Sequence, residues 1–113
     1  ALGRTEEAEA ALQKARSYAP QISDTWLLSA TLSRRKGDLA TARAQIFTAA
    51  KLDRANPAIG LEAGVIAALS GNDEAARKSW QSVLTIAPDA PEAETARTYL
   101  AQLDTPAPKE GTE

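Results

Sequence analysis

The sequence predicts an all-α fold, a right-handed solenoid of antiparallel helix pairs followed by a short tail. Alanine supplies 25 of the 113 residues and valine and isoleucine together supply 7, so the apolar residues are small and few are of the β-branched type that strands favour. Landmark residues recur every 34 positions. In the first and third copies, apolar residues fall at i, i+4, i+7 and i+11, which is the spacing of one helix face.

The repeat becomes visible when the chain is laid against itself at an offset of 34 residues. Three copies then agree in the size and chemistry of their aligned residues: Gly3, Gly37 and Gly71; Ala8, Ala42 and Ala76; Leu12, Ile46 and Trp80; and Tyr18, Leu52 and Ile86. A fixed period of this length indicates stacked supersecondary units, each of which buries its apolar face against its neighbours.

Glycine and proline divide each copy into two helices. Gly37 and Gly71 are placed to end one helix with a positive φ, and the Asp or Asn that follows each can cap the next helix. Pro57 and Pro91 can open helices. The predicted helices are Arg4 to Tyr18, Ser23 to Lys36, Leu39 to Asp53, Pro57 to Ser70, Asp73 to Ile86 and Pro91 to Leu103.

These helix boundaries predict one repeat domain over residues 1–103. It contains a half-repeat at 1–22, full repeats at 23–56 and 57–90, and a polar C-terminal capping helix at 91–103. Residues 104–113 hold no apolar side chain larger than alanine, so burial cannot offset the entropy of ordering them, and we expect a disordered tail. The helix in 1–22 lacks its own first partner, which suggests a C-terminal fragment of a larger protein and self-association through this helix.

Composition argues against most enzyme and cofactor chemistry. The chain has no Cys and no His, so we expect no thiol nucleophile, no imidazole base, no metal site and no cofactor. Its net charge of -2 does not favour nucleic-acid binding. The longest apolar stretch, 58–69, is interrupted by Glu62 and is too short to span a bilayer. We therefore expect a non-enzymatic protein without a membrane span in this segment.

The 34-residue helix–turn–helix period resembles the tetratricopeptide repeat family over residues 1–103. The residues that carry the resemblance are Trp26 at the leading tryptophan, Gly64 at the first-helix glycine, Ala8, Ala42 and Ala76 at the second-helix alanine, Leu12, Ile46 and Trp80 at the bulky position, and Pro20 and Pro88 at the closing proline. The sequence departs from the motif at Ser29-Ala30, Ser33, Ala67 and Arg54.

The resemblance implies a concave groove lined by the first helix of each repeat. The residues that it places there, as a partner-binding site, are Leu27, Thr31, Arg34, Arg35, Leu61, Glu62, Val65 and Tyr99. We expect an apolar centre with Arg34 and Arg35 at one rim, although cations at a helix C-terminus also have the structural role of offsetting the helix dipole. For Leu28 and Leu69, packing between repeats is as strong an expectation as ligand contact. The clamp of Lys, Asn and Arg by which some family members grip an acidic chaperone peptide is absent.

The predicted function is that of a scaffold or adaptor that takes a protein or peptide partner into this groove. The alanine-rich composition and the proline-containing linker look bacterial. An alternative is a spacer or oligomerisation segment of a larger protein whose activity lies upstream. RNA binding, as in related helical repeats, is disfavoured by the 34-residue period and by the acidic balance.

Overall fold

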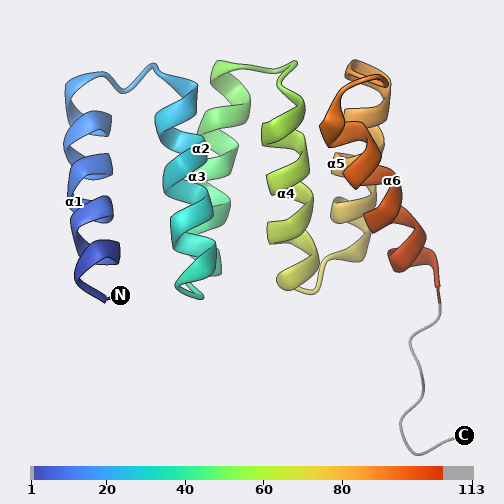
Figure 1. The fold of residues 1–113 in the computed structure, drawn as a ribbon, viewed down its shortest axis with the longest axis horizontal. Coiled ribbons are helices and arrows are strands. Elements are labelled where there is room, and N and C mark those ends of the chain that lie inside the picture. The colour runs from blue at the N-terminus through green and yellow to red at the C-terminus, as the bar shows by residue number, and fades with distance from the viewer. Residues whose placement is uncertain (1, 106–113) are drawn as a thin grey trace, which may run out of the picture.

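The computed structural model describes residues 2–105, which form six α-helices and no strand (Figure 1). The helices are α1 (Leu2–Tyr18), α2 (Ser23–Arg35), α3 (Leu39–Leu52), α4 (Pro57–Leu69), α5 (Asp73–Ile86) and α6 (Pro91–Asp104). The predicted all-α fold is confirmed, and each predicted helix is present with ends within two residues of the expected positions.

The helices form one elongated row in which successive helices run antiparallel (Figure 1). Two close pairs, α2 with α3 and α4 with α5, are the repeat units. The pairs are joined because α3 packs on α4, and α2, α4 and α6 also pack side by side. The result is an all-α repeat solenoid that measures 52 × 34 × 20 Å.

Glycine and a polar cap make the turn inside each pair. Gly37 and Gly71 have φ values of 86° and 84°, which is the left-handed region that glycine adopts without a steric penalty. Asp38 then caps α3 by accepting a hydrogen bond from the backbone N–H of Thr41, and Asn72 caps α5 in the same way. The hydrogen bonds from Thr41 hold the pKa of Asp38 below its ordinary value.

Small residues occupy the places where paired helices cross. Ala42 and Ala76 are fully buried, with exposed fractions of 0%. The equivalent Ala8 is exposed, because α1 packs only loosely on α2 and the described chain contains no closely paired helix for it. The position is therefore buried in both copies that have a closely paired helix.

The core consists of two clusters, one for each pair. The first contains Ala30, Ala42, Ile46, Ala49, Ile59 and Ile66, and the second contains Ala76, Trp80, Val83, Ala93 and Ala96. α4 joins them, since Ile59 and Ile66 belong to the first cluster while Leu61 and Val65 pack on the second. Alternate faces of one helix thus tie the repeats into a continuous core.

The two buried serines that depart from the repeat pattern, Ser29 and Ser33, both form hydrogen bonds. Ser29, exposed by only 2%, donates to the Thr25 carbonyl and accepts a hydrogen bond from Arg16 of α1. Ser33, exposed by 7%, donates to the side-chain oxygen of Gln45 at 2.7 Å. Each hydroxyl is therefore buried without the cost of a lost hydrogen bond.

The last helix is longer than predicted. Asp104, which we expected to begin the tail, is the final residue of α6 and forms an ion pair with Arg77 of α5. The hydrogen bond to Asp104 raises the pKa of Arg77. The rest of the predicted disordered tail, residues 106–113, lies outside the described residues. Within residues 2–105, no helix combines the length and apolar character needed to cross a membrane.

Candidate functional site

The side of the solenoid formed by α2, α4 and α6, here called the first-helix face, carries the predicted site. The three helices pack against one another in this order, so their outward side chains form one continuous surface. Two hollows lie on or beside this face, one between α4 and α6 and one between α1 and α2.

The α4/α6 hollow is a wholly apolar depression of about 250 Å³, lined by Val65, Ala68, Leu69, Trp80 and Tyr99. The Leu69 side chain is 58% exposed at its edge, whereas the Trp80 side chain is buried. The Trp80 and Tyr99 rings meet at a centroid distance of 5.1 Å and an angle of 50°, a favourable tilted arrangement. The hollow therefore has fixed aromatic walls and an exposed aliphatic rim.

The position of the Trp80 ring depends on Gly64. An added Cβ at Gly64 would lie only 2.1 Å from Trp80 Nε1, so the indole occupies space that a side chain on α4 would otherwise fill. From there, Nε1 donates a hydrogen bond of 3.2 Å to the Leu61 carbonyl. Gly64, sixteen residues before Trp80 in the sequence, therefore makes room for the ring that forms the inner wall of the hollow.

The centre of the first-helix face is polar, contrary to the apolar centre that we expected. Glu62 of α4 is paired with Arg34 of α2 and also accepts a hydrogen bond of 3.1 Å from the Thr31 hydroxyl. The two charged side chains are only 11% and 22% exposed, respectively. Arg34 is therefore neutralised within the fold, and of the two predicted rim arginines only Arg35 leaves its charge unpaired in the described chain.

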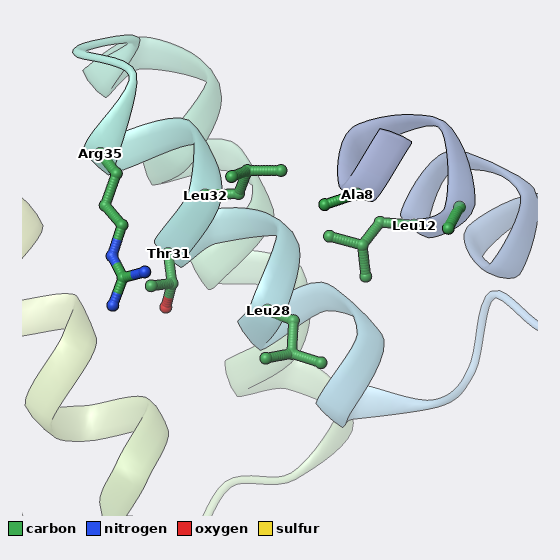
Figure 2. A pocket seen from close by; sticks show the side chains of 7 residues that line it. Ala8, Leu12, Leu28, Thr31, Leu32 and Arg35 are labelled. Carbon is green, nitrogen blue, oxygen red and sulfur yellow. The ribbon is translucent and has the colours of Figure 1, made fainter. Parts of the chain in front are cut away.

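The α1/α2 hollow is larger, about 430 Å³, and is lined by Ala8, Ala11, Leu12, Leu28, Thr31, Leu32 and Arg35. Figure 2 shows Ala8 and Leu12 of α1 pointing toward Leu32 of α2 across this hollow. Arg35 and Thr31 extend on the other side of α2, away from α1 (Figure 2). The hollow opens at the face of α1 that carries the exposed Ala8.

The four leucines considered for the groove lie in two different environments. Leu27 and Leu61, expected in the groove, are half-buried and pack against the first and second core clusters, respectively. Leu28 and Leu69, for which packing was an equal expectation, are each 58% exposed and line the two hollows. Val65 and Tyr99 line the α4/α6 hollow as expected.

Sequence reasoning missed Trp80 as a wall of the hollow. Ala68 and Leu69 follow from the register, because positions three and four residues apart share a helix face, and this places them beside Val65. Trp80 was correctly assigned to the repeat core, but nothing in its spacing indicated that one edge of its ring reaches the surface depression.

The two hollows are lined mainly by apolar side chains. Among residues 2–105, no cluster of three or more His, Cys, Asp or Glu is placed to hold a metal ion. No protein-family model matches the chain, and no curated protein is significantly similar to it. The first-helix face and its two hollows are therefore the features that indicate a function.

Proposed function

We propose that the chain is a tetratricopeptide-like protein-interaction module that binds an apolar segment of a partner protein through the first-helix face. The observation that carries this proposal is the α4/α6 hollow, with the exposed Leu69 over the fixed Trp80–Tyr99 pair. A preformed apolar hollow with rigid aromatic walls loses little entropy when it receives a side chain. We infer the role of a scaffold or adaptor, of bacterial type, without enzymatic activity.

The charged residues of the first-helix face orient the partner segment in this proposal. The Arg34–Glu62 pair is satisfied internally, so it presents few free groups to a ligand and separates the two apolar hollows. Arg35 stands beside the α1/α2 hollow with an unpaired charge in the described chain. A partner segment with an apolar anchor for the α4/α6 hollow and an acidic group toward Arg35 matches this arrangement.

The test is affinity capture of partners with Leu69→Glu. We expect this variant to weaken capture at least about tenfold, because burying a carboxylate in the apolar hollow is costly. Leu69 contributes little to the core, so the helical circular dichroism signal is expected to stay unchanged. Leu52→Glu is the control, since Leu52 is 41% exposed and lines neither hollow. Unchanged capture by a folded Leu69→Glu variant would move the interaction to another surface.

A second candidate function is self-association through the α1/α2 hollow. The observation that favours it is the exposed face of α1, where Ala8 is uncovered while the equivalent alanines of the other two copies are fully buried. An uncovered apolar face next to an open hollow tends to be buried by association. This candidate corresponds to the role of a spacer or oligomerisation segment.

Light scattering over a concentration series tests this association. We expect the chain to form dimers that Leu12→Glu dissociates, because Leu12 lines the hollow. Gln13→Glu is the matched control, since it places the same charge on an exposed residue that lies outside the hollow. A chain that stays monomeric at high concentration would exclude the second candidate, and dimers that both variants retain would place the contact elsewhere.

A further inference from the structure

A second groove runs along the opposite side of the solenoid, between α3 and α5. These two helices both pack on α4 but not on each other within the described chain. Two adjoining cavities of about 310 and 160 Å³ lie between them and share Ala50, Ala63 and Ser79. Seven of the seventeen residues that line the two cavities are alanine, serine or glycine, whose short side chains leave space between α3 and α5 unfilled.

One rim of this groove differs from the equivalent positions of the other repeats. Phe47 is 62% exposed at a position where the first and third copies carry Gln13 and Gln81. Arg54 takes the place of the prolines found in those copies, and Lys51 replaces a hydroxyl residue. Arg43, Phe47 and Lys51 are spaced at i, i+4 and i+8, which places them along one side of α3, and Arg54 lies in the turn that follows this helix. Phe47, Lys51 and Arg54, which with Arg43 form a stripe on this rim, therefore differ from the residues of the other two copies.

The stripe is positively charged and apolar, on a protein whose net charge is -2. α3 contains Arg43 and Lys51 and no acidic residue, and the Lys51 ammonium lies 5.0 Å from the centroid of the Phe47 ring. No ion pair joins Arg43, Lys51 or Arg54 to another residue in the range 2–105. The one carboxylate that lines the groove, Asp53, accepts a hydrogen bond from Asn56.

We propose that the α3/α5 groove is a second docking surface, which takes an amphipathic helix of a partner protein with apolar residues facing the groove and acidic residues facing α3. Arg43 and Lys51 are eight residues apart on α3, so the helical part of the stripe is about 12 Å long, a little more than two helical turns. Acidic side chains at that spacing meet the unpaired cations of α3, while the alanine-lined floor receives the apolar side chains.

The apolar floor distinguishes this occupant from a nucleic acid. A single-stranded RNA could stack a base on Phe47 and pair its phosphates with the cations. It would leave the apolar floor formed by Ala50, Ala63 and Ala67 unfilled, whereas a helix with apolar residues at i, i+3 and i+7 fills it. The proposal is independent of the first-helix face, because the α3/α5 groove shares no lining residue with either hollow of that face.

The test is selection from a displayed library of random 14-residue peptides, with counter-selection on Phe47→Gln. This variant installs the residue that the other copies carry at an exposed position, so the fold is expected to remain intact, which circular dichroism checks. We expect the enriched peptides to carry net negative charge and helical apolar spacing. Affinity for a synthetic copy is expected to fall about tenfold or more with Phe47→Gln and about threefold with Lys51→Glu.

Two control variants separate this surface from others. Lys14→Glu makes the same charge reversal on α1, and Leu69→Glu blocks the α4/α6 hollow. The affinity of both variants for the peptide is expected to stay within twofold of that of the unmodified chain. Recovery of no Phe47-dependent peptide, or only of peptides without net negative charge, would overturn the proposal. Binding of single-stranded poly(U) RNA to the unmodified chain, with loss of that binding in Phe47→Gln, would also overturn the proposal and would indicate a nucleic-acid surface.

Discussion

Gly64→Ala is expected to lower the free energy of unfolding by about 3 kcal/mol, a large effect for one methyl group. The new Cβ would lie 2.1 Å from Trp80 Nε1 and 2.5 Å from two ring carbons, so the indole must move. Movement disrupts the hydrogen bond to the Leu61 carbonyl and the contact with Tyr99. Urea unfolding followed by tryptophan fluorescence measures the effect, and the fluorescence of the folded state should change as well.

Gly3→Ala is the matched control for this substitution. An added Cβ at Gly3 meets no atom within 4 Å, and Gly3 lies within helix α1. Alanine is favoured over glycine in helices, so this variant is expected to be neutral or more stable by up to about 1 kcal/mol. Equal effects of the two substitutions would contradict the packing of Trp80 against the α4 backbone.

Ala42→Leu and Ala76→Leu are each expected to destabilise the fold by about 1 to 3 kcal/mol through overpacking. Both alanines are fully buried where the two helices of a pair cross, and a larger side chain there forces the helices apart. Thermal and urea unfolding measure the loss. The substitutions lie in different pairs, so their effects should be nearly additive in the double variant.

The equivalent alanine of the first copy supplies the control. Ala8 is aligned with Ala42 and Ala76 but is exposed, so Ala8→Leu is expected to change the free energy of unfolding by less than about 0.5 kcal/mol. Melting curves that are unchanged by all three substitutions would refute the 34-residue register. A loss at Ala8 as large as at Ala42 would mean that another helix covers α1 in solution.

The helices could be predicted because their signals are local and are repeated three times. The capping by Asp38 and Asn72, the positive φ of Gly37 and Gly71, and the placement of Pro57 at the start of α4 each depend on a few neighbouring residues. The repeat then adds a check, since a boundary seen in one copy recurs 34 residues later.

The candidate site was less predictable because neighbouring residues on the same helix differ in whether they pack on the core or line a hollow. Leu27 and Leu28 are one residue apart, or about 100° around the helix, and only the first packs on the core. The pairing of Arg34 with Glu62 joins residues 28 positions apart on different helices, a contact that no local pattern specifies. The structure places Val65 and Tyr99 in the α4/α6 hollow and Leu27 and Leu61 in neither hollow, and the role of all four in partner binding stays a prediction.

Site-specific photocrosslinking tests the proposed binding face most directly. A benzophenone amino acid is placed at Leu69, at the edge of the α4/α6 hollow, and at Gln81, an exposed residue of α5 that lines neither hollow of the first-helix face. Affinity-purified complexes are irradiated, and the crosslinked peptides are mapped by mass spectrometry. The proposal predicts a partner peptide with apolar residues joined at position 69 and none at position 81, whereas crosslinks at position 81 without any at position 69 would contradict it.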